Sequence, residues 1–351
     1  MSESHKYLIS GSAFKSFPVE TFFGLLFLSE KEALEIPKCH PFGGNWGYPL
    51  TKHLMEEESY PLPQFLDIIY LSIYEKKFYS LEANLPVDFM YSLWNNVDGY
   101  MRSVVNKYVI VGMAPYGCVA VWLYDEKKSY IVLWEHARQV NVEMKDFLPL
   151  STFTNVHDYC ESLIKKELEV ECFVAEDLFL RNRFDKYMQQ FTYRYQPLFE
   201  KWDDGEEVKW QKYKEGELQP EFEYIEESLF DGTFDKLHDD GLLKYHEAGK
   251  PKKLAIKWHI KKSEYTAYFW FEDERICTIF ERFYGAHPDT KTDFIIRIDA
   301  EQKKYELALF RQGLKEPQII PEDAYQLLVF KNKFEHYRSD NYNQERGAWI
   351  W

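Results

Sequence analysis

"LAIKWHIKKSEYTAYFWF", residues 254–271, is the stretch of sequence that decides the fold. In its first seven residues, large apolar side chains alternate with Ala255, Lys257 and His259. A period of two residues is the pattern of a strand that buries one of its faces. A second run, residues 265–271, is rich in aromatic residues, and the residues between the two runs are polar. The stretch therefore predicts an antiparallel hairpin.

A short helix is predicted directly after this hairpin. Apolar residues recur at positions 276, 279, 280 and 283, which is the spacing of one helix face. Residues 272–274 are all acidic, and the positive end of a helix dipole favours carboxylates. Gly285 follows the last apolar position, where a left-handed C-cap favours glycine. The next two strands are predicted at residues 294–299 and 305–310.

The segment that joins this helix to the next strand contains two candidate binding residues, His287 and Asp289, and the strand itself contains a third, Arg297. Loops carry functional side chains more often than cores do. A simpler interpretation is that Pro288 stiffens the loop and that Asp289 bonds nearby backbone N–H groups. Arg297 would then pair with a charge on its own strand face. Both interpretations stay open from the sequence.

The first half of the chain has a similar order of predicted elements. A pair of strands is followed by a helix with proline in its first turn, and then by three more strands. These elements are residues 66–73, 78–83, 85–96, 108–113, 118–124 and 130–136. The apolar positions of "LDIIYLSI" (66–73) match those of "LAIKWHIK" (254–261). The sequence therefore predicts an α+β fold with two related antiparallel-sheet modules of order ββαβββ, related by an old duplication.

A different segment separates the two predicted modules. Residues 155–200 have a mainly helical pattern, and residues 201–221 are charged and weakly patterned, which indicates a boundary. We therefore predict three parts. They are an N-terminal sheet module at 1–150, a helical connecting segment with a charged linker at 151–221, and a C-terminal sheet module at 222–351.

Composition and charge limit the class of partner. Aromatic residues make up 18% of the chain, which is typical of folded sheet proteins and not of disordered ones. The formal net charge is −15 at pH 7, so the chain repels phosphate backbones and nucleic acid is not an expected partner. The same charge would attract a basic protein and speed its association. An acidic surface also serves solubility alone.

The five cysteines and the N-terminal sequence favour a cytoplasmic protein. The cysteines are widely spaced and contain no C-x-x-C, which is typical of reduced thiols and not of disulfides or zinc sites. The N-terminus has no basic region followed by an apolar run, so no signal peptide is predicted. The apolar run at 22–28 is too short to span a bilayer, so no membrane span is expected.

The chain has no motif with catalytic spacing. H-E-x-x-H, G-x-S-x-G, the Walker P-loop and G-x-G-x-x-G are all absent from the sequence. Asp231, Asp235 and Asp239 would line one face of a continuous helix, but the order of an EF-hand is missing. A solvated acidic face is the simpler interpretation. We predict no catalytic residue, no metal and no cofactor.

Two further stretches are candidate contact regions. The glycine-rich loop "PFGGNWGYP" (41–49) supplies Trp46 and Tyr48, and aromatics in such loops are frequent at binding sites. The C-terminal residues 348–351, "AWIW", are apolar. We expect them to pack against the fold itself or against a partner.

Residues 40–145 resemble a bacterial domain-of-unknown-function family, DUF2931. The shared marks are a proline-led aromatic strand, K-x-F-Y, a Leu-Pro helix start and a hairpin of the form G-x-A-P-x-G-x-V-x-V-W. Its positions here are Gly112, Ala114, Pro115, Gly117, Val119, Val121 and Trp122. The resemblance implies no catalytic residues. Members are often lipoproteins or neighbours of secreted-toxin genes, which implies an immunity role, although this chain lacks an early cysteine that could take a lipid.

The expected function is that of a non-enzymatic protein-binding module, an immunity protein that occludes a basic toxin with an acidic, aromatic-rich face. An alternative from another class is a small-ligand-binding protein or a hydrolase-like enzyme with a pocket near His287, formed with Asp289, Arg297 and Trp46. A third is a structural protein with a large homomeric interface. Convergence of the candidate residues in one cleft would favour the second reading.

Overall fold

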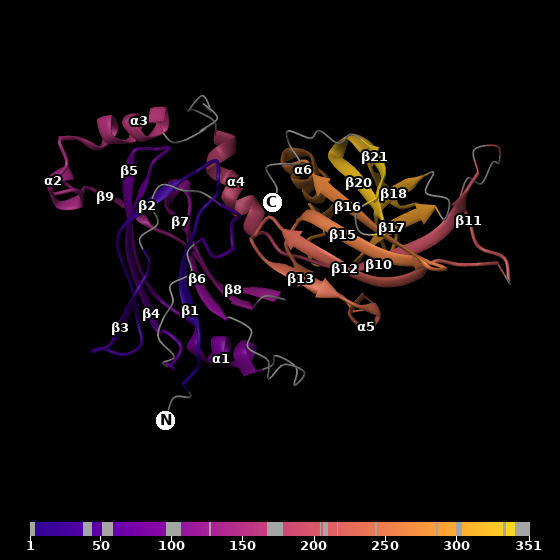
Figure 1. Cartoon of the computed structure of the whole chain (residues 1–351), viewed down its shortest axis with the longest axis horizontal. Coiled ribbons are helices and arrows are strands. Elements are labelled where there is room, and N and C mark those ends of the chain that lie inside the picture. The colour runs from indigo at the N-terminus through magenta and orange to yellow at the C-terminus, as the bar shows by residue number, and fades with distance from the viewer. Residues whose placement is uncertain are drawn as a thin grey trace. The chain divides into compact units, whose positions relative to one another are not determined.

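The chain forms two compact units in a computed structural model. The structure describes residues 4–37, 44–50, 59–95, 107–125, 128–166, 178–203, 205, 210–215, 217–242, 244–285, 287–299, 304–332 and 335–340. Unit 1 comprises residues 1–185 with 231–233, and unit 2 comprises residues 186–230 with 234–351. Figure 1 draws most of unit 1 in indigo to magenta and most of unit 2 in orange to yellow. The predicted packing of residues 348–351 lies outside the described residues.

Unit 1 contains two sheets. The first has the strand order β1 (Leu8–Ser12), β6 (Tyr108–Met113), β7 (Cys118–Asp125) and β8 (Lys128–His136). The second has the order β3 (Ala33–Glu35), β2 (Val19–Phe27), β4 (Phe65–Ser72), β5 (Lys77–Asn84) and β9 (Arg138–Val140). Alternate residues of both sheets are buried together in one apolar core, which includes Leu26, Ile68, Tyr70, Val109 and Val121.

Short helices cover parts of these sheets. They are α1 (Val87–Asn95), η1 (Pro115–Gly117), α2 (Met144–Phe147), α3 (Val156–Lys166) and α4 (Leu178–Met188), the last of which crosses the unit boundary. Helix α1 buries Met90 and Trp94, whereas Phe89 is 49% exposed. Helices α2 and α3 pack on the outer face of β4 and β5, where Phe147 and Cys160 join a cluster with Leu71 and Phe78. This covers one end of the outer sheet face.

Unit 2 also contains two sheets. One has the order β13 (Phe234–Leu237), β12 (Glu221–Leu229), β15 (Pro251–Ile260), β16 (Ser263–Phe271), β20 (Tyr325–Lys331) and β21 (Glu335–Asp340). The other has the order β11 (Trp210–Gln211), β10 (Phe191–Trp202), β17 (Thr292–Asp299), β18 (Tyr305–Arg311) and β19 (Gln318–Ile320), and β14 (His246–Ala248) pairs with β10. The helical elements are α5 (Asp239–Leu242), α6 (Asp273–Tyr284) and η2 (Glu322–Ala324).

The predicted α+β class is confirmed at its coarse level, because antiparallel sheets dominate and short helices connect them. The opening hairpin is β15 and β16, in register from Ile260 opposite Ser263 to Lys253 opposite Trp270. Two of the four sheets are nevertheless mixed, since β1 lies parallel to β6 and β10 lies parallel to β17. Each predicted strand–helix–strand run is divided between two sheets, because the helix carries the chain from one sheet to the other.

Three local predictions were wrong. Gly285 caps α6, but with φ −46° and ψ −41° it keeps the right-handed conformation. Residues 191–200, expected to be helical, form most of strand β10, in which Phe191, Tyr193 and Tyr195 are buried at a period of two residues. Asp231, Asp235 and Asp239 do not line one face of a continuous helix, because residues 221–229 and 234–237 form the hairpin of β12 and β13. In β10 and in the β12–β13 hairpin, aromatic residues pack across a sheet, and this tertiary packing overrides the helical pattern.

The strand pairings follow the same order in both units. The order β3–β2–β4–β5–β9 in unit 1 corresponds to β13–β12–β15–β16–β20 in unit 2. The parallel pair β1 and β6 corresponds to β10 and β17. In both units a helix, α1 or α6, follows the central hairpin and leads to the parallel pair.

Two irregular features fix the correspondence residue by residue. Strand β2 has a bulge between Thr21 and Phe23, next to Tyr70 on β4, and β12 has a bulge between Phe222 and Tyr224, next to Trp258 on β15. The ring of Tyr70 stacks on Tyr79 at 5.6 Å, and the ring of Trp258 stacks on Tyr265 at 5.7 Å. This register makes Tyr70 equivalent to Trp258 and aligns residues 66–72 with residues 254–260, as the apolar pattern does.

Candidate functional site

The two aromatic candidates from the sequence lie in unit 1. Trp46 is only 4% exposed, and its ring stacks on Phe14 at 4.5 Å and meets the Trp122 ring edge-on at 4.8 Å. Tyr48 is half-buried, with its ring edge-on to Tyr124 at 5.9 Å. Trp46 is therefore a core residue, and its ring is not offered to a ligand.

The three candidates from unit 2 are spread along one connection and one strand. His287 and Asp289 are exposed in the turn between α6 and β17. Arg297 lies five residues further along β17 than Thr292, the first residue of that strand. At roughly 3.3 Å per residue, Arg297 is about 17 Å from Thr292. Its guanidinium pairs with Glu306 at 2.7 Å and with Glu200 at 3.4 Å. The structure therefore does not bring Arg297 to His287 and Asp289, and Arg297 has the same-face charge partners that the simpler interpretation predicted.

A cysteine, a histidine and an aspartate meet in unit 1, but not as a nucleophilic triad. The Cys118 sulfur lies 3.7 Å from Nε2 of His136, and the same Nε2 lies 3.2 Å from Asp185. A relay needs the two partners on different ring nitrogens. Burial, followed by the charges of Asp185 and Glu75, raises the pKa of the Cys118 thiol well above its ordinary value. The thiol is therefore kept protonated and unreactive.

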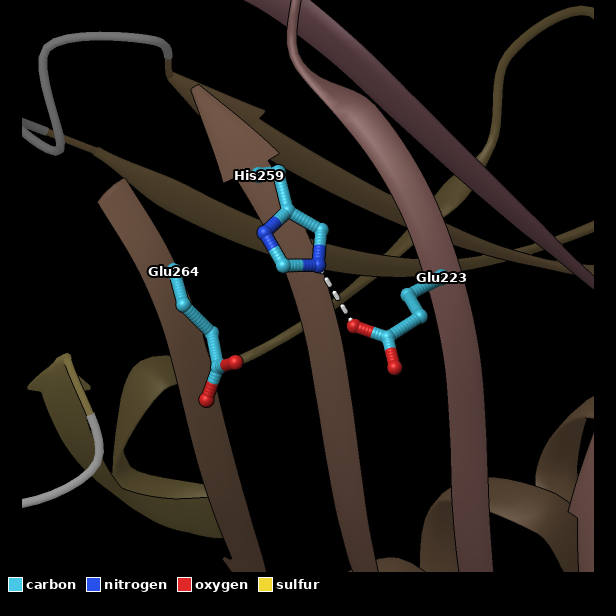
Figure 2. Close-up of side chains that lie close together, drawn as sticks. All are labelled: Glu223, His259 and Glu264. Carbon is cyan, nitrogen blue, oxygen red and sulfur yellow. Dashed lines mark hydrogen bonds and ion pairs between the residues drawn. The ribbon is translucent and has the colours of Figure 1, made fainter. Parts of the chain in front are cut away.

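Glu223, His259 and Glu264 form a polar cluster on the outer face of unit 2. Figure 2 shows the three side chains on neighbouring strands, with His259 Nε2 directed at Glu223 at a distance of 2.6 Å. Their ligand-type atoms lie within 4.8 Å of one another, a geometry that could hold a metal ion. Lys257, however, places its ammonium 3.1 Å from Glu223 and 3.0 Å from Glu264. A cation of the chain itself therefore already bridges the two carboxylates.

The β-bulge explains why this cluster can form. Glu223 is the extra residue of the bulge in β12, so its side chain joins that of Tyr224 on the side of Lys257 and His259. Burial raises the pKa of the Glu223 carboxyl, but the hydrogen bonds from His259 and Lys257 outweigh it and lower the pKa. We interpret the cluster as a surface ion-pair network, in which each charge has a partner.

A second polar group lies inside unit 2. The side chain of Glu227 is 3% exposed, accepts a hydrogen bond from the Tyr195 hydroxyl at 2.6 Å and lies 3.5 Å from Nε2 of His246. Desolvation lowers the pKa of His246, but Glu227 outweighs it and raises the pKa. The ion pair therefore stabilises the fold below the ordinary pKa of histidine, and this stabilisation is lost as pH rises through the raised pKa.

Removing the Tyr195 hydroxyl is expected to destabilise unit 2. The Tyr195→Phe variant should lower its free energy of unfolding by about 1–3 kcal/mol, because the buried Glu227 carboxylate loses its closest donor. Urea denaturation at neutral pH measures the change. Tyr268→Phe serves as the control, because that half-buried ring lies on the outer face of the sheet. Equal stability of Tyr195→Phe and the parent chain would contradict a charged Glu227.

The outer sheet face of unit 1 combines aromatic rings with unpaired carboxylates. Register places Phe65 directly opposite Phe27, Glu35 opposite Leu25, and Asp67 opposite both Leu25 and Glu82. Phe23 lies on the same face and is 38% exposed. We call this surface the acidic aromatic face, and its residues are Phe23, Phe27, Glu35, Phe65, Asp67 and Glu82.

The carboxylates of this face lack compensation. Within the described part of the chain, Glu35, Asp67 and Glu82 form no ion pair with a lysine or arginine. Burial raises the pKa of Asp67, and the charge of Glu82 raises it further. Like charges directly opposite on neighbouring strands are unfavourable. Unfavourable charge that is kept on an open surface is typical of a site that serves binding and not folding.

Neutralising Asp67 is expected to stabilise unit 1. The Asp67→Asn variant should gain up to about 1 kcal/mol at neutral pH, because the repulsion with Glu82 disappears. The pKa of Asp67 is raised in the folded state, so Asp67 becomes protonated and loses its charge as the pH falls through that pKa. The parent chain is then freed of the same repulsion, and the difference in stability between the variant and the parent chain should vanish. Urea denaturation of both proteins at neutral and mildly acidic pH measures it. A gain that is independent of pH would contradict the charge repulsion.

Sequence reasoning passed over the acidic aromatic face although a signal was present. Asp67 interrupts the apolar pattern of residues 66–73, and Glu82 lies in the partner strand predicted at 78–83. The two strands pair through the turn of residues 73–76, whereas the predicted strand included residue 73, so the predicted bounds did not place these carboxylates opposite each other. The contribution of β2 and β3 could not be seen, because no strand was predicted there.

The comparisons with known proteins found one family that matches part of the chain. Residues 33–197 match the model of a family described as "Protein of unknown function (DUF2931)", which confirms the resemblance noted at 40–145. No curated protein and no solved structure matches the chain significantly. Among the described residues, no helix combines the length and apolar character needed to cross a membrane. Residues 33–197 of the chain are thus similar to the DUF2931 family, whose function is unknown.

Proposed function

We propose that the chain is a protein-binding module that uses the acidic aromatic face of unit 1 to bind a basic protein, and that it serves as an immunity protein by covering the active surface of a toxin. The observation that carries this proposal is the row of unpaired carboxylates Glu35, Asp67 and Glu82 beside three phenylalanine rings. Phenylalanine anchors exclude water from an interface, and the carboxylates steer a basic partner towards it.

Unit 2 provides an internal control for this argument. In the shared register, Lys236 is equivalent to Glu35, Ala255 to Asp67 and Tyr268 to Glu82. Lys236 is moreover paired with Glu226 at 3.1 Å. The same arrangement of strands therefore forms with balanced charges at these positions. The fold does not require the unpaired carboxylates of unit 1, and a function in binding supplies the reason for them.

The proposal includes the origin of the two units as related modules. The common strand order, the two bulges at equivalent positions and the two stacked ring pairs support a duplication. Bulges are specific features that related proteins retain, and a chance match of register and bulge together is improbable. After duplication, only unit 1 would have acquired the acidic aromatic face.

Co-expression with the product of a neighbouring toxin-like gene tests the function. We expect a stable complex on size exclusion and survival of the host cell. The doubly neutralised chain, Asp67→Asn with Glu82→Gln, should fold normally and yet protect less. A matched control, Glu247→Gln with Glu316→Gln, removes the same charge from exposed positions of unit 2. Equal protection by the two double variants would overturn the role of the face.

A further inference from the structure

A crevice of about 450 Å³ opens at one end of the acidic aromatic face. It is lined by Phe27, Ser29, Glu30, Gln64, Phe65 and Asn84, with Leu85 and Val87 behind them. A volume in this range is typical of sites that take a small molecule or one large side chain. The crevice lies wholly within unit 1.

Two phenylalanine rings line the crevice. Phe27 and Phe65 are directly opposite on β2 and β4, and their rings meet edge to face at a centroid distance of 5.9 Å. Asn84 is directly opposite Phe65 on β5. Both rings are half-buried, so each keeps part of its surface open to the crevice.

The rim supplies hydrogen-bond acceptors on a fixed backbone. The backbone N–H of Gln64 donates to Phe27 O, and that of Leu85 donates to Gln64 O, both at 2.8 Å. The side chains of Glu30, Gln64 and Asn84 are exposed, and they form no hydrogen bond or ion pair with any described residue. One carboxylate and two amide oxygens are therefore available to a ligand.

We propose that this crevice binds the guanidinium group of an arginine side chain on the basic partner, an inference that rests on the proposed function. A guanidinium is planar, stacks on aromatic rings and presents five N–H donors in a fork, which suits two phenyl rings beside a carboxylate and two amide oxygens. The neighbouring carboxylates Glu35, Asp67 and Glu82 add attraction for a cation. A lysine ammonium is a strongly hydrated point charge, so it interacts less favourably with these rings and with the planar carboxylate and amide acceptors.

The equivalent place in unit 2 already holds a cation of the chain. In the shared register, Lys253 is equivalent to Phe65 and Trp270 to Asn84. The Lys253 ammonium lies over the Tyr268 ring at 4.9 Å and over the Trp270 ring at 5.8 Å. Unit 2 thus supplies both the cation and the rings from its own chain. Unit 1 supplies rings and carboxylates at this place, and the arginine of a partner provides the missing cation.

Binding of short basic peptides to the full chain tests the proposal. Labelled hexa-arginine, hexa-lysine and hexa-citrulline are titrated, and fluorescence anisotropy measures their affinities. We expect hexa-arginine to bind at least about 10-fold more tightly than hexa-lysine, and hexa-citrulline to show no binding, because bidentate recognition of a stacked guanidinium distinguishes the three. Equal affinities for arginine and lysine peptides would overturn the proposal.

Two variants locate the effect. Phe65→Leu and Glu30→Gln should each weaken the binding of hexa-arginine at least about 5-fold and leave the binding of hexa-lysine nearly unchanged. Glu316→Gln on unit 2 should change the affinity for neither peptide. Circular dichroism confirms that each variant is folded. An arginine preference that survives both crevice variants would place the binding elsewhere. The peptide titration tests only the arginine site, and the co-expression experiment tests the immunity role. A chain that prefers arginine peptides but does not protect against the toxin would contradict the immunity role and leave the arginine site standing.

Discussion

A chain carrying Asp67→Lys and Glu82→Lys is expected to bind the proposed basic partner at least about 100-fold more weakly than the parent chain, a loss of about 2.7 kcal/mol. The two positions are directly opposite on β4 and β5, in the centre of the acidic aromatic face. Lysines there would place like charges against the partner, and such juxtaposition costs several kcal/mol. Surface plasmon resonance on the toxin-like partner measures both rate constants.

The rate constants separate steering from direct contact. Loss of long-range attraction should appear as a slower association rate that depends steeply on salt, because exposed charges are screened within about 10 Å at 0.1 M ionic strength. The control is Glu247→Lys with Glu316→Lys, which makes the same change of net charge on exposed residues of unit 2. If this control loses as much affinity as the Asp67/Glu82 variant, then net charge alone governs binding and the face has no special role.

Trp258→Ala should lower the free energy of unfolding of unit 2 by about 3–5 kcal/mol, because a fully buried ring is replaced by a cavity. Trp258 is 0% exposed and stacks on Tyr265 with an angle of 10° between the rings. Tyr70→Ala is the equivalent change in unit 1. It should cost a similar amount, since Tyr70 is also 0% exposed and its hydroxyl donates to Ala114 O at 2.7 Å.

Hydrogen exchange with mass spectrometry measures the two effects separately, because protection is read for each segment of the chain. Trp258→Ala should lose protection in β12, β15 and β16, and Tyr70→Ala in β2, β4 and β5. Phe89→Ala is the control, because this exposed side chain of α1 should change stability by less than about 0.5 kcal/mol. A uniform loss of protection over both units from either core variant would show that they unfold as one body and not as two.

The sequence predicted the central hairpin and helix of each unit because their patterns are local. Alternation in residues 254–260 and the apolar stripe of α6 each depend on neighbours within a few residues. The same reasoning failed for β10, where the alternation of Phe191, Tyr193 and Tyr195 lies in a segment that was predicted to be helical, and for β12 and β13, whose charged residues leave no clean period of two. It also missed β1, β2 and β3, so the edge of the acidic aromatic face that Glu35 supplies was invisible.

The candidate residues show the same limit. Trp46 looked like a ligand contact because it lies in a glycine-rich loop, yet Phe14 and Trp122 enclose it in the core. Asp67 looked like an ordinary polar residue of a strand, and only pairing with β5 shows that it faces Glu82. Whether a side chain is exposed, and which charge it meets, depends on strands far away in the chain.

The amino-acid sequence by itself determined the short-range features of this protein, namely the central hairpins with their following helices, the excess of negative charge and the family resemblance. The tertiary structure decided how the strands are divided among four sheets, which rings are buried and which carboxylates stand unpaired. The reason is physical. Local periodicity depends on steric preferences within a few residues, whereas charge repulsion and burial depend on distances that only the folded chain sets.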